Sequence, residues 1–340
     1  MRRALFLGSP FFDYYRHIIG ALQARGFEVD YYNDRPGENA FVKGAFRVRP
    51  NLVHRTVRNY LNTILEETRE GAYDLIFVVN GKVFDPAFIC ELRRRHPRAE
   101  AVLYLWDSIQ LYPHVLEFSS LFDRRYTFDS ADARVHPDFQ LLPLFFTHDY
   151  QAVGAALSPN ADFDVANVCT AHANRYVLMK TLIPELEAAD LRIYSYLYLH
   201  PFQFAYNKLR MDAFARARPR EFRFRPLSVE GYIDVLRRSR SVLDVSHTAQ
   251  SGLTMRTIET VGARRKLITT NSEVLKYPFY HPTRVLVLDP NRTNASTIRD
   301  FIKAPQQDIL ESTRELYCID TWAQQIISGE VDAHASVLAQ

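Results

Sequence analysis

The stretch SGLTMRTIET, residues 251–260, holds the residues whose types and spacing best suit the binding of a phosphate group. It follows the apolar run 241–247, which predicts a strand that turns into a helix beginning near Thr254. The first N–H groups of a helix are unpaired and lie at the positive end of its dipole, so they suit a diphosphate. Gly252 would allow close backbone approach, and Ser251 or Thr254 would cap the helix or bind a phosphate.

Two charged residues in the same helix extend this hypothesis. Arg256 lies in the first turn, where a cation opposes the helix dipole unless an anion is there to pair with it. Glu259 lies at the end of that turn or just beyond, within reach of a ribose whose diphosphate occupies the helix start. An ordinary capped helix with an exposed glutamate explains these residues equally well. The residues alone therefore leave capping and anion binding as alternatives.

More cationic and polar residues border this candidate donor site. His172, Arg175 and Lys180 follow the predicted strand 164–170, and two cations facing a diphosphate can offset the charge that grows on a leaving nucleotide. Solvated cations on a helix face are the alternative explanation. Met255 and His247, which flank the helix start, complete the predicted donor-binding set.

The first half of the chain offers a second set of polar residues, each where a predicted strand ends. These are Gly8 and Ser9 after the first strand, and Asn80, Gly81 and Lys82 after the third. Asp107 ends the fourth strand behind Trp106, where partial desolvation would make its carboxylate a usable base. The carboxyl ends of parallel strands share one edge, so we expect an acceptor site there with Asp107 as base or sugar contact. The alternative for Asp107 is a helix cap for the segment that begins at Ser108.

Several other kinds of chemistry lack their sequence signals. His114, His136 and His148 show no HxH or HExxH spacing, and the DFD at 162–164 precedes a strand, so no metal ligand set is predicted. The chain has no GxSxG, GxxxxGK[ST] or GxGxxG pattern, which removes the main support for hydrolase, P-loop and dinucleotide-binding functions. We therefore expect no cofactor and no metal.

Alternating strands and helices must position these residues. Consecutive apolar runs predict strands at 4–8, 27–33, 74–80, 99–107, 124–129 and 139–146, and again at 164–170, 191–199, 221–227, 241–247, 266–271 and 283–289. Helical spacing of apolar residues lies between the early strands, at 11–25 and 51–70. The pattern predicts two doubly wound, Rossmann-like α/β domains facing across a cleft.

The domain boundaries follow from the same pattern. We expect a first domain over 1–150, a linker over 151–163, and a second domain over 164–318. The segment 319–340 is predicted to be a helix that packs back toward the first domain. A chain of 340 residues exceeds the usual size of a single core, which agrees with two domains.

Composition limits the partners and the compartment. The net charge of +3, with both signs interspersed, argues against a nucleic-acid surface. Three scattered cysteines without CxxC spacing, and no apolar run long enough to span a membrane, predict a cytoplasmic protein. The basic clusters Arg2–Arg3 and Arg93–Arg95 leave a peripheral contact with anionic lipid at the inner face of the membrane open.

The segment 241–271, SVLDVSHTAQSGLTMRTIETVGARRKLITTN, resembles the nucleotide-sugar-binding segment of GT-B glycosyltransferases. In those enzymes a strand is followed by E-G-x-G-[apolar]-x-x-x-E, a helix, a small-residue turn and a strand with a Thr/Asn end. The chain is especially similar to the bacterial CgeB-like, group 1-like set. The likeness also covers 104–109, 128–137 and 164–186.

The resemblance implies that 1–150 is an acceptor-binding domain and 164–318 a nucleotide-sugar-binding domain, and it assigns roles to individual residues. It implies that Glu259 contacts the donor ribose and that Arg175 and Lys180, with R-x4-K spacing, bind the diphosphate in place of a metal. Ser251 stands where the family pattern has its first glutamate, so the role of that carboxylate and a retaining mechanism do not carry over.

The sequence thus predicts a metal-independent glycosyltransferase. Its donor would be a nucleotide sugar, and its acceptor a hydroxyl of a glycan or lipid-linked molecule in bacterial surface polysaccharide synthesis. A nucleotide-sugar epimerase and a non-catalytic nucleotide-binding protein with two lobes are the alternatives.

Overall fold

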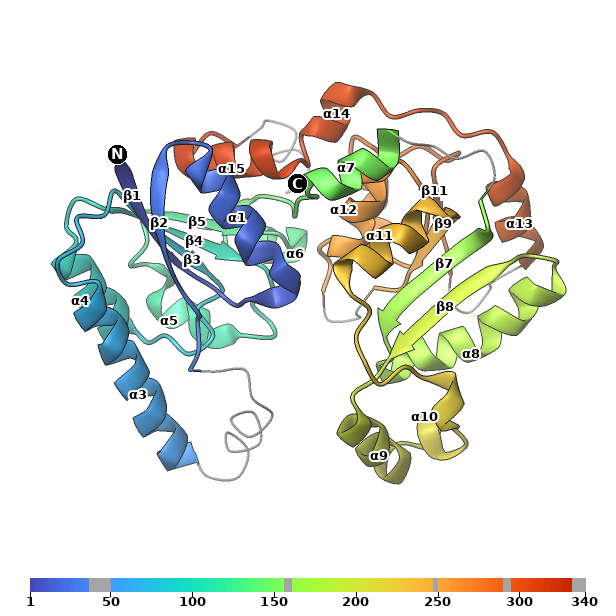
Figure 1. The fold of residues 1–340 in the computed structure, drawn as a ribbon, viewed down its shortest axis with the longest axis horizontal. Helices are drawn as coiled ribbons and strands as arrows, with labels where there is room; N and C mark the ends of the chain where they lie inside the picture. The colour runs from blue at the N-terminus through green and yellow to red at the C-terminus, as the bar shows by residue number, and fades with distance from the viewer. Residues whose placement is uncertain (37–49, 156–160, 247–249, 290–294, 332–340) are drawn as a thin grey trace. The chain divides into compact units, whose positions relative to one another are not determined.

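The computed structural model describes residues 1–36, 50–155, 161–246, 250–289 and 295–331 of the chain (Figure 1). These residues fold as two compact units. The first unit takes the described residues within 1–144, 249–252 and 319–340, and the second takes those within 145–248 and 253–318. Both units are α/β, with parallel sheets, as the alternating pattern predicts.

The first unit is built on six parallel strands in the order β2-β1-β3-β4-β5-β6. The strands are β1 (Arg2–Leu7), β2 (Phe27–Tyr32), β3 (Leu75–Val79), β4 (Glu100–Leu105), β5 (Arg124–Thr127) and β6 (Gln140–Leu141). The helices are α1 (Tyr14–Gln23), α3 (Pro50–Glu67), α4 (Pro86–Arg95), α5 (Leu116–Ser119), α6 (Ser130–Val135) and α15 (Ile319–Ser328). Every residue of β3 is buried, because helices cover both faces of the sheet.

Alternate side chains of each strand point to opposite faces of this sheet. Leu5 of β1 and Ile76 of β3 pack in one cluster with residues of α3, α4 and α5. On the other face, Trp322 of α15 packs edge-on against Phe77 and Tyr104, with ring centroids 5.9 and 5.0 Å away. This buried indole is the reason that the C-terminal helix joins the first unit.

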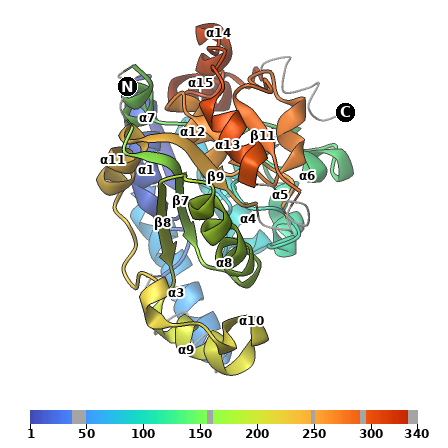
Figure 2. The ribbon, with the colours of Figure 1, turned by 90° about the vertical axis from the view of Figure 1, so that its right-hand side faces the viewer.

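The second unit has five parallel strands in the order β11-β10-β9-β7-β8. They are β7 (Phe163–Thr170), β8 (Ile193–Tyr198), β9 (Ser239–Asp244), β10 (Lys266–Thr269) and β11 (Val285–Val287). The helices are α7 (His148–Ala155), α8 (Ala173–Ala188), α9 (Pro201–Arg210), α10 (Asp212–Ala215), α11 (Val229–Arg237), α12 (Met255–Gly262), α13 (Ala295–Lys303) and α14 (Glu311–Glu315). Figure 2 shows α8 and α13 on the same side of this sheet, where they share one apolar core.

Several predicted segments differ from the structure. The strand predicted at 139–146 is limited to Gln140–Leu141, and the helix predicted over 319–340 ends at Ser328. Residues 156–160 of the predicted linker and 332–340 of the last segment lie outside the described residues. The run 221–227 forms no strand: a 3-10 turn over Pro219–Glu221 precedes it, and Arg223 makes one isolated bridge with Tyr198 of the edge strand β8. Pro226, which lacks an N–H group, prevents the ladder from continuing. The predicted linker 151–163 begins inside α7, since small residues there let this helix pack closely on α12.

The close approach of α7 to α12 yields a stability prediction. A Cβ atom built at Gly154 of α7 would lie 2.7 Å from the carbonyl oxygen of Gly262, which is backbone and cannot swing away. Gly154→Ala should therefore lower the free energy of unfolding by about 1–3 kcal/mol in chemical denaturation. The control is Gly20→Ala in α1, where nothing lies within 4 Å. That change should raise stability by about 0.5–1 kcal/mol, and equal effects of the two variants would contradict the close packing.

Candidate functional site

Asn80 connects the loops after β3 and β4 in the first unit. It follows β3 in a left-handed conformation, with φ of 63°, and its side chain is buried. Its Oδ1 accepts hydrogen bonds from the backbone N–H groups of Trp106 (2.8 Å) and Asp107 (3.2 Å), and its Nδ2 donates to Asp107 Oδ2 (2.9 Å). One amide thus holds the backbone after β4 and orients the carboxylate predicted to be catalytic.

Asp107 is an ion-paired carboxylate and not the desolvated one expected from its apolar strand. Its Oδ2 lies 3.1 Å from the ammonium of Lys82, and its side chain is 28% exposed. Burial lowers the pKa of Lys82, but Asp107, Tyr112 and Asp34 together outweigh this effect and leave that pKa raised. Lys82 also lies 4.8 Å from the centre of the Tyr112 ring. The pairing with Lys82, absent from any local sequence signal, sets the chemistry of Asp107.

Asp34 is a site residue that the sequence analysis missed. It follows β2, and its fully buried carboxylate accepts hydrogen bonds from Ser9 Oγ (2.7 Å) and the Lys82 N–H (3.5 Å). Burial raises the pKa of Asp34, and these two residues and Arg35 pull it back in part. The signal that selected Ser9 and Asn80, a polar residue just after a buried strand, would have selected Asp34 as well.

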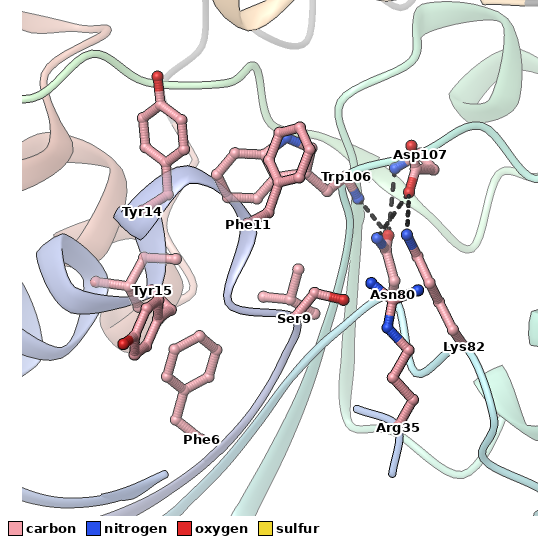
Figure 3. Close-up of a pocket in the computed structure, with 12 residues that line it drawn as sticks. Phe6, Ser9, Phe11, Tyr14, Tyr15, Arg35, Asn80, Lys82, Trp106 and Asp107 are labelled. Carbon is pink, nitrogen blue, oxygen red and sulfur yellow. Dashed lines mark hydrogen bonds and ion pairs between the residues drawn. The ribbon is translucent and has the colours of Figure 1, made fainter. Parts of the chain in front are cut away.

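These polar residues form one wall of a pocket at the carboxyl edge of the first sheet (Figure 3). The polar side comprises Ser9, Arg35, Asn80, Lys82 and Asp107, and the aromatic side includes Phe11, Tyr14, Tyr15 and Trp106. A pocket with apolar walls and a few convergent polar groups suits a small polar ligand that carries an apolar face, as a sugar ring does.

The two predicted glycines lie beside this pocket and are not among its lining residues. Gly81 has a φ of 69°, which lets the chain turn between Asn80 and Lys82. A Cβ at Gly8 would lie 3.0 Å from the ring of Phe6. The glycines therefore shape the loops, while Ser9, Asn80, Lys82 and Asp107 are brought together as the sequence predicts.

In the second unit, Asp244 fixes the start of α12 to the end of β9. Its Oδ2 accepts hydrogen bonds from Thr254 Oγ1 (2.6 Å) and Thr257 Oγ1 (2.8 Å). Thr254 is the N-cap, and its Oγ1 accepts a hydrogen bond from the Thr257 N–H (3.2 Å). The helix starts at Met255, which is partly exposed, one residue after Thr254 as the sequence indicates. A positive helix end is thereby held rigidly at the carboxyl edge of the sheet.

Glu259 and Arg256 form an ion pair inside α12. The guanidinium Nη1 lies 2.9 Å from Glu259 Oε2, and the side chains are 24% and 5% exposed, Arg256 being the more open. Arg256 also stacks on Tyr232 of α11, 3.5 Å from the ring centre. Burial raises the pKa of Glu259 to about 8, against the pull of the adjacent guanidinium. The ion pair with Glu259 explains why the cation Arg256 lies in the first turn of the helix. The alternative of an exposed glutamate does not hold, because Glu259 is buried.

The two predicted cations of α8, Arg175 and Lys180, point in different directions. Arg175 Nε donates a hydrogen bond to the carbonyl oxygen of Val245 (2.7 Å), so Arg175 reaches the segment that leads from β9 toward α12. Lys180 is exposed and its ammonium lies 5.6 Å from the ring of Tyr176. Residues five apart on a helix point about 140° apart, so the pair does not converge. His172 is the exposed N-cap residue of α8, and His247 lies outside the described residues.

Ser251 and Gly252 have protein partners within the first unit. Their N–H groups donate to Asp129 Oδ2 at 2.8 and 3.1 Å, and the Ser251 hydroxyl also donates to this carboxylate. Asp129 in turn caps α6. A Cβ at Gly252 would lie 2.5 Å from the ring of Phe128, so this glycine is required for close packing on that ring. These contacts, and not a phosphate, account for both residues in the structure.

Comparison with known structures identifies the fold. No protein family matches the sequence, and no curated protein matches it. Among solved structures, a glycosyltransferase from Rickettsia africae matches with a TM-score of 0.56 and 11% identity over 99% of both chains. HepE of Anabaena, solved with UDP and glucose, matches at 0.52 and 12% identity, over 99% of this chain and 97% of that one.

A UDP-GlcNAc 2-epimerase from Methanocaldococcus jannaschii is similar to the same degree. Its TM-score is 0.52 at 10% identity, over 96% of this chain and 98% of the epimerase. At such identities the likeness establishes the fold, and the predicted GT-B class with two Rossmann-like domains is confirmed. Within the described part of the chain, no helix combines the length and the apolar character that crossing a membrane requires.

The buried Glu259 predicts a pH-dependent stability. The carboxyl has an ordinary pKa of 4.5 when unfolded and about 8 when folded, so the native state holds the extra proton between these values. The free energy of unfolding should therefore fall as the pH rises from 4.5 to 8, by an amount on the order of 5 kcal/mol. Glu259→Gln, which does not titrate, should remove this slope. Denaturation of both proteins across this pH range tests the idea, and identical slopes would contradict it.

Proposed function

We propose that this chain is a metal-independent glycosyltransferase similar to the CgeB-like set, which transfers a sugar from a nucleotide-sugar donor to a hydroxyl of a glycan or lipid-linked acceptor. The observation that carries the proposal is the start of α12, a capped helix at the carboxyl edge of β9 with a buried carboxylate, Glu259, in its first turns. This is the position at which the resemblance implies a ribose contact. Synthesis of a bacterial surface polysaccharide is the setting that the resemblance suggests.

Donor binding would use the helix start and Arg175. The unpaired N–H groups of α12 and the guanidinium of Arg175 would face the diphosphate, and Glu259 would accept hydrogen bonds from the ribose hydroxyls. The ion pair with Arg256 supports this role, because it holds Glu259 in one orientation before the nucleotide arrives. Because Lys180 lies against the ring of Tyr176, we assign the diphosphate contact to Arg175.

Acceptor activation would use the pocket of the first unit. An acceptor hydroxyl beside Asp107 would give its proton to this carboxylate while its oxygen forms the new bond to the anomeric carbon. The bond from that carbon to the donor's phosphate oxygen breaks, and the nucleoside diphosphate leaves with the electron pair. Lys82 and Asn80 hold the Asp107 carboxylate in one orientation. The growing charge on the diphosphate would be met by Arg175 and the α12 dipole.

The donor assignment predicts a loss of nucleotide binding on mutation. In titration calorimetry with a panel of nucleoside diphosphates, Glu259→Ala should weaken the best ligand by about tenfold or more, because two hydrogen bonds to a buried carboxyl group are lost. The matched control is Glu185→Ala, an exposed glutamate on α8, which should bind normally. No binding of any nucleoside diphosphate to the wild type, or unchanged binding to Glu259→Ala, would remove the assignment.

Catalysis is tested separately from binding. Nucleotide sugars are incubated with the protein, with and without a mixture of oligosaccharides, and mass spectrometry follows released nucleoside diphosphate and new glycosides. Asp107→Asn should slow transfer by about 100-fold or more while nucleotide affinity stays unchanged, because only the proton acceptor is lost. Asp138→Asn, at an exposed position of the same unit, is the control. Equal rates for both variants would exclude Asp107 as the base.

The similarity to epimerases supports a second candidate function, a nucleotide-sugar epimerase. The same incubation distinguishes the two. Conversion of the donor to an isomeric nucleotide sugar without any acceptor would establish the epimerase and overturn the transferase.

A further inference from the structure

The surface of α9 has an apolar stripe that no described part of the chain covers. Phe202, Tyr206 and Leu209, spaced as i, i+4 and i+7, lie on one side of the helix and are 78%, 55% and 85% exposed. An exposed leucine is ordinary by itself, but three large apolar side chains in one helical row form a contiguous patch. Such a patch usually marks an interaction surface.

The opposite side of α9 holds the helix firmly in the second unit. Phe204 packs against Phe222 and Phe224, with ring centroids 5.3 and 5.6 Å away. Asn207 is buried and accepts a hydrogen bond from Gln203 Nε2 (2.6 Å). The outward direction of the stripe therefore follows from packing on the inner side.

The segment that carries this stripe is rich in cations. The segment 201–225 contains seven lysines and arginines and two acidic residues, a net charge of +5, whereas the whole chain carries +3. The seven cations are Lys208, Arg210, Arg216, Arg218, Arg220, Arg223 and Arg225, and all of them are exposed. Among the described residues, no carboxylate lies within ion-pair distance of any of them. We call the stripe and these cations together the α9 surface.

The α9 surface differs in this respect from the basic cluster Arg93–Arg95 that the sequence singles out. Arg93 pairs with Asp123, Arg94 with Glu91, and Arg95 with both Glu66 and Glu91. Those arginines are neutralised by the protein itself. In the described part of the chain, the cations of the α9 surface have no carboxylate in an ion pair with them, although Lys208 Nζ donates a hydrogen bond to the carbonyl oxygen of Ala217 (2.9 Å).

We propose that the α9 surface docks on a lipid bilayer that contains anionic phospholipids. The exposed phenylalanine, tyrosine and leucine would enter the boundary between headgroups and acyl chains, and the cations of the same segment would pair with lipid phosphates. Because α9 starts three residues after β8 ends, it lies beyond the carboxyl end of that strand, as Figures 1 and 2 show. Docking would thus bring to the membrane the same edge of the sheet at which α12 starts.

Two other occupants fit the α9 surface less well. A second copy of the chain packing through the same surface would place a charge of +5 against its equal, which is repulsive. Single-stranded nucleic acid would suit the cations and the aromatic rings, but an almost fully exposed leucine offers no stacking partner to a base. A bilayer uses the apolar and the charged residues together. The proposal does not depend on glycosyl transfer.

The test is sedimentation of the full chain with vesicles, without any nucleotide. The wild type should bind vesicles of phosphatidylcholine and phosphatidylglycerol in equal parts, bind phosphatidylcholine vesicles weakly, and be released by high salt. Phe202→Ser combined with Leu209→Ser should weaken binding by about tenfold or more, because two apolar side chains no longer leave water. Arg216→Glu combined with Arg220→Glu should weaken vesicle binding by about fivefold for each arginine that is lost.

Matched controls keep the test specific. Leu310→Ser removes another leucine of the second unit that is 73% exposed, and Arg237→Glu reverses an exposed arginine outside the α9 surface. Both controls should bind vesicles like the wild type, and thermal unfolding should show all variants folded. The proposal is overturned if the wild type does not bind the anionic vesicles, or if the α9 variants bind as well as the controls.

Two further results would also overturn it. One is a concentration-dependent dimer that the Phe202 and Leu209 changes dissolve while vesicle binding is unaltered. The other is tight binding of a single-stranded oligonucleotide that persists after those two changes, with no binding to vesicles. Either result would leave the nucleotide-binding prediction for Glu259 untouched.

Discussion

Parallel strand pairing, with helices on both faces of each sheet, is the constraint on which both units depend. A strand such as β3 can be wholly apolar only if both of its faces are covered, and its polar backbone groups are then satisfied by the neighbouring strands. Because all strands of a sheet run the same way, the polar residues that closely follow each strand emerge at one edge. Ser9, Asp34 and Asn80 are such residues in the first unit, and Asp244, the last residue of β9, takes the same place in the second.

Polar groups gathered at one edge must find partners, and in this protein they find each other. Asn80 binds the backbone and carboxylate of Asp107, Lys82 neutralises that carboxylate, and Asp244 holds two threonines of α12. A network in which each buried polar group is satisfied is rigid, so its geometry exists before any ligand arrives. A ligand at either edge would meet oriented groups instead of having to order them.

The distribution of charge follows a different rule. The net charge of +3 argued against a nucleic-acid surface, yet it conceals a local difference: the cluster Arg93–Arg95 is neutralised by nearby carboxylates, and the cations of the α9 surface are not. The cations between residues 208 and 225 are not neutralised locally, because the two acidic residues of this segment form no ion pair with them. Glu221, for example, accepts hydrogen bonds from Tyr176 Oη and the Arg218 N–H. Total charge therefore says little about the local field, which depends on which carboxylates the fold brings near each cation.

The sequence by itself determined the alternation of strands and helices, the α/β class with two units, and the start of α12 after Thr254, because these depend on local periodicity and capping. It also singled out Ser9, Asn80, Lys82 and Asp107, which share one pocket. Tertiary structure decided their partners. Arg256 pairs with Glu259 and stacks on Tyr232, and Asp107 pairs with Lys82. Ser251 is hydrogen-bonded to Asp129, and Lys180 points away from Arg175. Whether a charged side chain is paired, buried or exposed depends on residues distant in the chain, and such neighbours leave no periodic signal in the sequence.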